Sequence, residues 1–257
     1  MTSSLKKTLL TTLGIVLILL IWVIVSASIS NSSMIFPNPL VTLKETLKLL
    51  GKSFTYKCIF QSLLKTFLGF LLSFVFAMLL GVIAGNIEEF RTILSPLLSV
   101  LKSIPTATLV FLFLVLVGAK NAPIIMVFII CFPIIYEAVV RGFENIDINI
   151  KRAAVMDGAN LSQKLFKIYI PIISPYIIVG IASSFSLSFK IEIMSEVISG
   201  TTTDGLGSMI SACQKSDPTN MTPIFAYSLI GIVIIAIFSL ALYFLERKVI
   251  TSTSPNI

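Results

Sequence analysis

Polar and charged side chains recur at helical spacing within the apolar stretch 172–198. Steps of four, four, three and four residues separate the members of this polar stripe, so they stack on one face of a helix: Ser184, Ser188, Glu192, Ser195 and Ser199. Lys190 and Glu196 lie close to the stripe in the sequence. Each ionised group at mid-membrane costs about 3 kcal/mol on insertion scales, so these charges are expected to face a pathway or a partner residue.

Two interpretations of the stripe stay open. The first is a translocation pathway, lined by Ser184, Ser188, Lys190, Glu192, Ser195, Glu196 and Lys65. The second is structural: serine hydroxyls bond to the preceding turn and hold packed helices together, and Lys190 and Glu192 form a buried ion pair. The counter-charges available in other apolar stretches are Lys65, Lys102 and Glu137. Because Lys65 and Glu196 both fall toward the outer ends of their stretches, we predict that they pair.

The segment 141–171 is polar and charge-dense, in contrast to the apolar runs on either side of it. Asp147 is suited to cap a short helix from Ile148 to about Met156, because its carboxylate can accept the free N–H groups of the first turn. Gly158 suits the left-handed turn that closes such a helix. Asn160 and Gln163 form a capping pair for a second helix, which is predicted to end where Pro171 opens the next apolar run. We expect this segment to lie in water between two membrane spans.

The composition identifies the elements that must position these residues. The chain has 257 residues, of which 56% are hydrophobic and only 12% charged, and its mean hydropathy is +1.01. Soluble domains carry about a quarter charged residues. We therefore predict a single all-α polytopic membrane domain over 1–257. Its six spans are placed at about 9–29, 60–85, 93–117, 122–140, 172–198 and 224–244, with the 141–171 loop between the fourth and fifth. The third span is expected to be interrupted at Pro96 and Pro105.

Charge and chemistry narrow the function. Six spans place both termini on the same side as the 141–171 loop, and basic residues are more numerous on that side, which indicates the cytoplasm. The net charge of +7 is then explained by membrane lipid rather than by nucleic acid. The chain has no histidine, and its three cysteines have no metal-ligand spacing. No catalytic base, metal site, phosphate loop or cofactor is expected, so the chain is not predicted to be an enzyme.

The 141–171 loop resembles the EAA loop of the membrane subunits of type I ABC importers. That loop reads E-A-A, three residues, G, nine residues, I-x-L-P, and five residues here fall on its spacing: Ala153, Ala154, Gly158, Ile168 and Pro171. Arg152 replaces the glutamate and Ile170 replaces the leucine. In the family this loop forms the coupling helix that inserts into the ATPase subunit. The resemblance implies ATPase docking by Ala153, Ala154, Asp157, Gly158, Ala159 and Leu161.

The resemblance extends from about Pro37 to Lys248. Over this range the chain is similar to the nitrate, sulfonate and taurine branch of these permeases. Its landmarks include Pro37-Asn38-Pro39, Ser62 with Lys65, Gly69-Phe70, Ile104-Pro105, Phe132-Pro133, Glu196 and Gly205-Leu206-Gly207. It implies a permease in the bacterial cytoplasmic membrane that pairs with a second permease copy. Two ATPase subunits, which hold ATP and Mg, and an extracytoplasmic substrate-binding protein are the other implied partners. The cargo is not fixed, since sulfonates, nitrate, bicarbonate and vitamin precursors all occur among such permeases.

Two other classes remain possible on the residues alone. An ion-coupled secondary transporter would use Lys190, Glu192 and Glu196 as ion or proton sites and would need no ATPase. A membrane-embedded enzyme is less well supported, because the chain offers no convergent set of reactive side chains beyond that same cluster.

Overall fold

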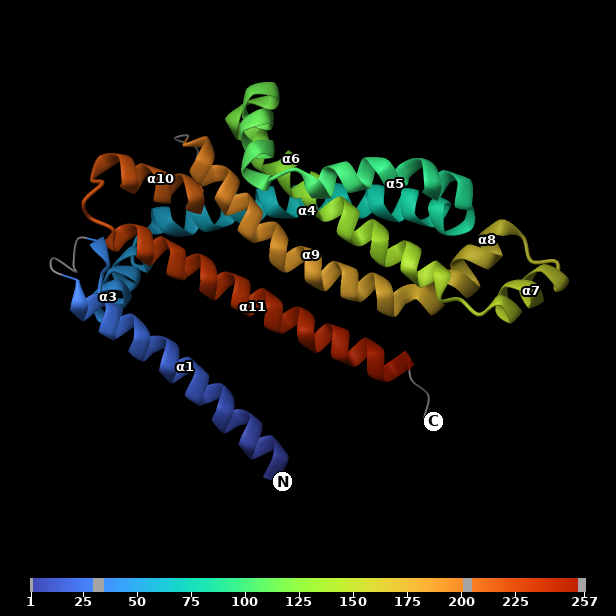
Figure 1. Cartoon of the computed structure of the whole chain (residues 1–257), viewed down its shortest axis with the longest axis horizontal. Helices are drawn as coiled ribbons and strands as arrows, with labels where there is room; N and C mark the ends of the chain where they lie inside the picture. The colour runs from blue at the N-terminus through green and yellow to red at the C-terminus, as the bar shows by residue number, and fades with distance from the viewer. Residues whose placement is uncertain (1, 30–34, 201–204, 254–257) are drawn as a thin grey trace.

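The computed structural model describes residues 2–29, 35–200 and 205–253, which fold into helices without a strand. The predicted all-α class is confirmed. The elements are α1 Thr2–Ser28, α3 Pro39–Leu50, α4 Ser53–Asn86, α5 Glu88–Ser103, α6 Thr106–Glu144, α7 Ile148–Met156, α8 Leu161–Gln163, the π-helical segment η1 Lys164–Tyr169, α9 Ile170–Ser199, α10 Leu206–Ser216 and α11 Thr222–Thr253. Most of the long helices run along the long axis of the molecule (Figure 1).

Five stretches of the described residues are long and apolar enough to cross a membrane: Leu9–Ser28, Ser53–Asn86, Thr106–Glu144, Leu161–Ser199 and Thr222–Phe244. Four of the predicted spans fall on α1, α4, α9 and α11. The predicted third span, 93–117, is not one helix, because α5 ends at Ser103 and α6 begins at Thr106. Ile104 and Pro105 between them have extended backbone, as expected of a proline and the residue before it. Pro96, the other predicted interruption, lies within α5.

A joint at Gly118 divides α6 into two helical segments. Gly118 has φ 77° and ψ 162°, outside the helical region, and it lies between the predicted spans 93–117 and 122–140. The segment before it projects from the side of the bundle (Figure 1). Leu109 and Val110 of this segment are buried in one apolar cluster with Met126 and Val127 of the following segment. In place of two continuous helices over 93–117 and 122–140, the structure has α5, a short segment and one long helix, and the number of membrane crossings stays a prediction.

The core forms where the second segment of α6 packs against α4 and α9. Small residues of α4 recur every fourth position and let the two backbones approach closely: Gly69, Ser73, Ala77, Gly81 and Gly85. A Cβ atom at Gly69 would lie 2.7 Å from the Cβ of Val127, and one at Gly81 would lie 2.9 Å from the Cβ of Val139. At these glycines α4 and α6 therefore pack too closely to admit a side chain.

The two ends of the bundle carry different elements. α7 and α8 form one end, and α3 and α10 lie at the other (Figure 1). From the end that carries α3, both α1 and α11 extend along the bundle in the direction of α7, so the first residues of α1 and the last residues of α11 lie away from the α3 end. α1 is tied to the rest through its last turns, where the Trp22 Nε1–H donates to the Pro37 carbonyl (3.1 Å) and the Ser26 hydroxyl donates to the Phe36 carbonyl (3.0 Å). Which side of the membrane each end faces stays a prediction.

Replacing Gly69 with valine is expected to destabilise the protein by about 1 to 3 kcal/mol, the usual cost of overpacking a core. The side chain would collide with Val127 and with the Ile124 carbonyl of α6. Thermal unfolding of the purified protein in detergent measures this as a lower midpoint. Gly14→Val in α1 is the matched control, because nothing lies within 4 Å of a Cβ there. Equal midpoints for the two variants would contradict close packing of α4 on α6.

Candidate functional site

A buried ion pair joins α4 to α9. The Lys65 Nζ contacts the Glu196 carboxylate, and the side chains are only 10% and 1% exposed. The pairing predicted from the sequence is therefore present. Two charges taken out of water are tolerated when they are paired and their remaining hydrogen-bonding capacity is satisfied.

The rest of the Glu196 carboxylate is satisfied by α4 and by the start of α10. The Ser62 hydroxyl (3.0 Å) and the Gly207 backbone N–H (2.9 Å) both donate to its Oε2. The Leu206 N–H donates in turn to the Ser62 Oγ (2.9 Å). A Cβ at Gly205 would overlap the carboxylate, which explains why glycine stands there. Glu196 is thus the junction of three helices, near the end of the bundle opposite α7.

The polar stripe of α9 lies inside the chain. Ser184, Ser188, Glu192 and Ser195 are fully buried, and Lys190 is exposed. Ser184 donates to the Gly180 carbonyl (2.6 Å) and Ser188 to the Phe185 carbonyl (2.6 Å), as expected of hydroxyls that bond to the preceding turn. This burial favours helix packing over a pathway lining for these four side chains, and for Lys65 and Glu196.

The proposed ion pair between Lys190 and Glu192 is absent from the part of the chain that the structure describes, and this expectation was wrong. The reason is geometric: residues two positions apart on a helix point in different directions. Glu192 faces the interior, where neither of its carboxylate oxygens has a hydrogen-bond partner among the described residues. Lys190 faces outward.

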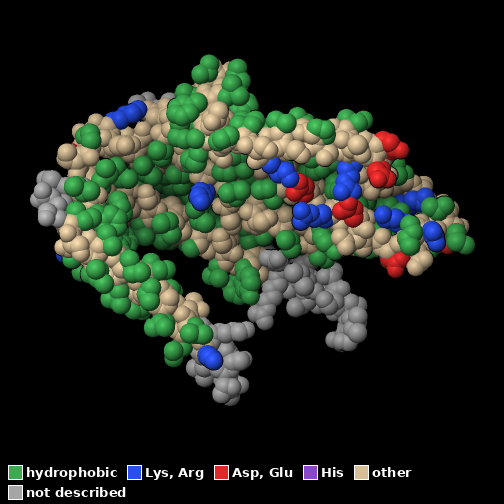
Figure 2. Space-filling model, in the orientation of Figure 1, with side chains coloured by type: hydrophobic (Ala, Val, Ile, Leu, Met, Phe, Trp, Pro, Cys, Tyr) green, Lys and Arg blue, Asp and Glu red, His purple; other side chains and the backbone are tan. Residues whose placement is uncertain are grey.

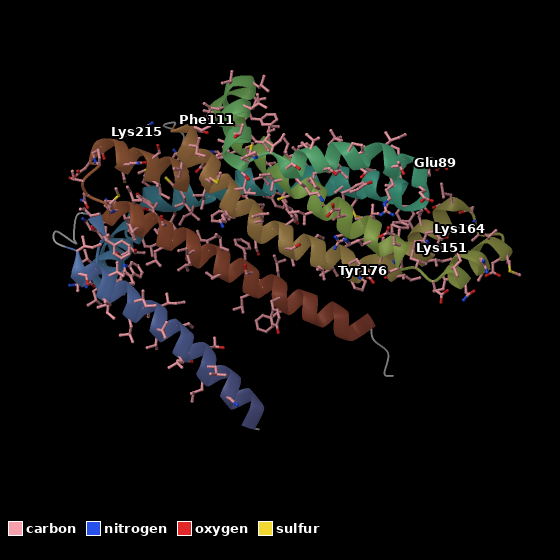
Figure 3. The ribbon with its side chains drawn as sticks, in the orientation of Figure 1. Glu89, Phe111, Lys151, Lys164, Tyr176 and Lys215 are labelled. Carbon is pink, nitrogen blue, oxygen red and sulfur yellow. The ribbon has the colours of Figure 1, made fainter. Side chains whose placement is uncertain are left out.

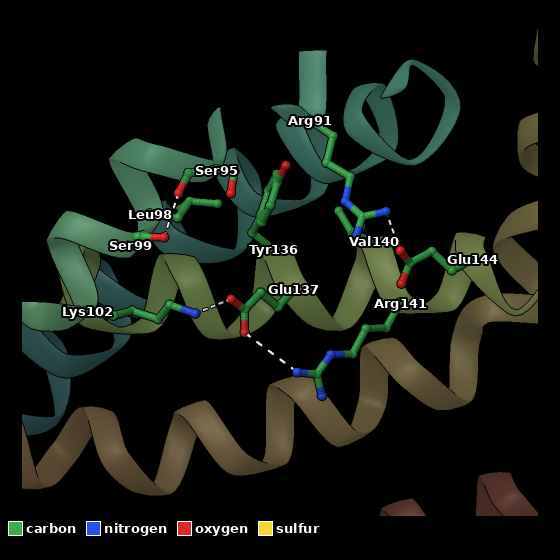
Figure 4. A pocket seen from close by; sticks show the side chains of 10 residues that line it. All are labelled: Arg91, Ser95, Leu98, Ser99, Lys102, Tyr136, Glu137, Val140, Arg141 and Glu144. Atoms are coloured by element: carbon green, nitrogen blue, oxygen red, sulfur yellow. Dashed lines mark hydrogen bonds and ion pairs between the residues drawn. The ribbon is translucent and has the colours of Figure 1, made fainter. Parts of the chain in front are cut away.

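A second charged cluster lines a cavity of about 220 Å³ between α5 and the end of α6 (Figure 4). Lys102 pairs with Glu137, and Arg91 pairs with Glu144. Arg141 lies 4.0 Å from the second oxygen of Glu137. Lys102 and Glu137 were named in the sequence only as available counter-charges.

Hydroxyl groups complete the lining of this cavity. Ser95 and Ser99 lie one turn apart on α5, and the Ser99 hydroxyl donates to the Ser95 carbonyl (2.9 Å). The Tyr136 hydroxyl is buried and has no hydrogen-bond partner among the described residues. Sequence reasoning missed these groups because it treated 93–117 as one apolar span. The four-residue steps between serines at 95, 99 and 103, with Lys102 beside them, were the available signal.

The charges of this cavity are open to the outside of the chain. Arg141 is 70% exposed, Lys102 48% and Glu137 35%. Figure 2 shows basic and acidic side chains gathered on this face of the molecule. Arg141 also borders a hollow lined by Tyr176 and Val179 of α9, so the surface continues from α5 across α6 to α9. A surface with these charges is unsuited to hydrocarbon and must meet protein or water.

The 141–171 loop has the local structure predicted for it. Asp147 accepts from the Asn149 N–H (2.8 Å) at the start of α7, and Gly158 has φ 65°. Asn160 and Gln163 make the reciprocal capping box, at 2.8 Å and 3.0 Å. The Lys151 Nζ donates to the Phe143 carbonyl (2.9 Å). This hydrogen bond joins α7 to the end of α6 (Figure 3).

One feature of this loop differs from the prediction. The second helix does not end at Pro171, because α8, η1 and α9 follow one another without interruption. The residue before Pro171 is helical, and the proline lies in the first turn of α9. A proline has no N–H to donate, and a helix accommodates it when the hydrogen-bonding pattern of the preceding turn changes. The π-helical turn directly before it provides that adjustment. The loop therefore leads rigidly into α9.

The residues implied in docking are exposed to different degrees. Ala153, Asp157, Gly158 and Leu161 are exposed, Ala159 is half-buried and Ala154 is only 3% exposed. Ala154 therefore serves packing of the loop in this structure. Three large apolar side chains that the sequence analysis did not select are exposed beside them: Val155, Met156 and Phe166. Leu161 is exposed as well, so α7, α8 and η1 all present large apolar side chains at this end of the bundle, here called the tip.

The long apolar helices, with a charged outward face and a polar loop at one end, are those of a multi-pass membrane protein. Residues 77–251 match the family described as "Binding-protein-dependent transport system inner membrane component". The chain belongs to this family. The match runs from the last turns of α4 through α5, α6, the loop and α9 into α11, and includes every residue that lines the charged cavity.

Curated relatives agree with the branch that the sequence resembles. The chain is 25% identical over 237 residues to the putative aliphatic sulfonates transport permease protein SsuC of Bacillus subtilis, covering 91% of this chain and 83% of the relative. It is 23% identical to the taurine transport system permease protein TauC of Escherichia coli (88% and 81% covered). It is 25% identical to the nitrate import permease protein NrtB of Synechocystis (73% and 70% covered).

Solved structures share the fold. Inward-facing MetNI methionine ABC transporter has a chain that aligns with a TM-score of 0.65 at 19% identity, covering 76% of this chain and 96% of that one. An amino acid ABC transporter crystallised with histidines aligns with a TM-score of 0.64 at 18% identity (81% and 97% covered).

Removing one partner of the buried pair is expected to cost about 3 to 5 kcal/mol, because an uncompensated charge would remain in the interior. Lys65→Met and Glu196→Gln should each lower the unfolding midpoint in detergent strongly. The double variant should recover part of the loss. Lys48→Met is the control: its pair with Glu45 (3.3 Å) is on the surface, where such pairs contribute at most about 1 kcal/mol. A Lys65→Met protein as stable as the control would contradict the role of the pair.

Proposed function

We propose that this chain is the membrane-spanning permease subunit of an ATP-driven importer. It forms the translocation pathway for a small solute that an extracytoplasmic binding protein delivers. Membership of the binding-protein-dependent family supports the class. The observation that carries the coupling is the 141–171 loop, which presents an apolar tip on a capped, rigid turn at one end of the bundle.

The tip is suited to docking in a groove of an ATPase subunit. Leu161, Met156 and Phe166 are 67%, 86% and 69% exposed, which is costly unless a partner covers them. Ala153 and Gly158 are small and allow close approach of the partner. ATP and Mg would bind to the two ATPase subunits, so the chemistry of hydrolysis takes place outside this chain.

The loop is mechanically connected to the proposed pathway. Lys151 ties α7 to the end of α6, and α8 continues through η1 into α9. A displacement of the loop would therefore move α6 and α9 together. These two helices carry Glu137, Arg141 and Lys190, so the displacement would change the access of the charged face to either side of the membrane.

The distribution of exposed side chains indicates how the chain is oriented within the membrane. Large exposed residues of α4 and α11 are apolar and suit lipid, for example Phe67, Leu79, Ile232 and Leu240. The face of α5, α6 and α9 is charged, so we infer that it meets a second permease copy around the pathway. The inner loop and both termini face the cytoplasm, and the membrane is the bacterial cytoplasmic membrane.

The cargo is proposed at the level of a class. The relatives' names mention aliphatic sulfonates, taurine and nitrate, so a small organic or inorganic anion, or a zwitterion, is the first candidate. The ion-coupled alternative receives less support, since Glu192 and Glu196 are buried in the chain.

Uptake by the reconstituted complex tests the function. Proteoliposomes that contain the permease, its cognate ATPase and the binding protein should accumulate solute only with internal ATP. Orthovanadate should reduce the rate to background. Uphill uptake by the permease alone on an ion gradient would contradict the proposal and favour the secondary transporter.

Gly158→Val should uncouple the complex. A β-branched residue at φ 65° costs about 1 to 3 kcal/mol and would distort the turn that sets the tip. We expect ATP-driven uptake to fall at least about tenfold while the permease still assembles in the membrane. Gly158→Asn is the matched control, because asparagine adopts this backbone conformation more readily and should retain most uptake. Normal uptake by Gly158→Val would count against the docking role of the loop.

A further inference from the structure

Resting on the proposed function, we propose that the cavity between α5 and α6 is a transient binding site for solutes that carry an anionic oxygen group, such as a carboxylate or another oxyanion. Its ligand groups are the N–H donors of Lys102 and Arg141 and the hydroxyl of Tyr136. This site is separate from the buried polar stripe of α9.

The charge balance of the cavity is positive. Three cationic side chains line it, and two carboxylates partly neutralise them: Arg91, Lys102, Arg141, Glu137 and Glu144. An anion that enters meets a net charge of +1 at the wall, in a cleft whose protein walls weaken the screening by water.

The supply of hydrogen-bond donors exceeds that of acceptors. An ammonium group has three N–H donors and a guanidinium has five, and neither accepts a hydrogen bond. Glu137 is engaged by both Lys102 and Arg141. Arg141 is held most weakly, since its ion pair with Glu137 spans 4.0 Å and its side chain is 70% exposed. Its planar donor fork is therefore free to bind an oxyanion in bidentate geometry.

Tyr136 provides an independent sign of a missing ligand. The residue is 3% exposed, and its buried hydroxyl has no hydrogen-bond partner among the described residues. An unsatisfied buried hydroxyl costs about 1 to 3 kcal/mol. Figure 4 shows Tyr136 standing between Ser95 and Arg91 at the wall of the cavity. A ligand oxygen, directly or through a water molecule, would accept a hydrogen bond from this hydroxyl.

A cationic solute fits this wall less well. Both carboxylates already contact cationic side chains, and one of them contacts two. The volume of about 220 Å³ restricts the site to small solutes. The cavity lies in the half of the bundle that leads to α7, so we place the site on the later part of the inward route.

Charge-selective labelling of a cysteine at position 99 tests the site without knowledge of the cargo. Ser99→Cys in the full complex in lipid nanodiscs would be treated with 2-sulfonatoethyl methanethiosulfonate, which is anionic, and with its trimethylammonium analogue, which is cationic. Rates are divided by those for 2-mercaptoethanol, and the protein without the new cysteine gives the background of native thiols. We expect the anionic reagent to react at least about tenfold faster, as electrostatic focusing in clefts predicts.

Second variants assign the preference to the named residues. Arg141→Gln and Lys102→Gln, each combined with Ser99→Cys, should reduce the preference several-fold. Millimolar methanesulfonate should protect the cysteine, tetramethylammonium should not, and Tyr136→Phe should weaken the protection. Ser103→Cys is the matched control, since it lies one turn further along α5, is exposed and does not line the cavity.

Three results would overturn the site: equal rates for the two reagents, a faster cationic reagent, or no labelling in either the nucleotide-free or the vanadate-trapped complex. The labelling does not depend on transport. An anion preference in a protein whose uptake proves independent of ATP would therefore reject the proposed function and keep the site. Vanadate-sensitive uptake without an anion preference would do the reverse.

Discussion

A polar group that faces the hydrocarbon of a bilayer is strongly unfavourable, and the arrangement of this chain follows from that constraint. Three solutions are visible in it. Serines of α9 bond to their own helix inside the chain, and Glu196 is enclosed by Lys65, Ser62 and the start of α10. The charges of α5 and α6 instead lie at an outward surface. This third group needs contact with protein or water outside the single chain, and for that reason we propose that its face meets the pathway.

The second segment of α6 connects the two ends of the mechanism. It packs against the small residues of α4 on one side and against α9 on the other. The end of this segment nearest α7 carries Glu137, Arg141 and Glu144. Helix α7 begins four residues after Glu144. A helix that is tightly packed along its length transmits displacement as a rigid body. The charged cavity is therefore well placed to respond to movement of the loop.

The end of α9 that lies far from the loop is held by an ion pair and hydrogen bonds to Glu196. Glu196 receives contacts from α4 and α10 as well as lying on α9, and glycine at 205 and 207 lets the α10 backbone reach it. Movement of α9 at the loop end would thus occur against a point that is held by charge-assisted hydrogen bonds. Such bonds are about twice as strong as neutral ones. Under the proposed coupling, α9 would have a fixed end at Glu196 and a moving end at the loop.

The sequence by itself determined the class, the loop and one long-range contact. Hydropathy identifies membrane helices because only helices satisfy their backbone in lipid, and the caps at Asp147, Gly158 and Asn160 depend on residues at most three positions away. The Lys65–Glu196 pair was predictable because few buried charges are available to neutralise each other.

The tertiary structure alone decided which polar residues are enclosed and which face outward, since helical periodicity shows that Ser184 and Ser188 share a face but not what that face contacts. It also decided that α5 folds back along the second segment of α6, and so brought Ser99, Lys102 and Arg141 to one cavity, whereas the break at Pro105 was expected from the sequence.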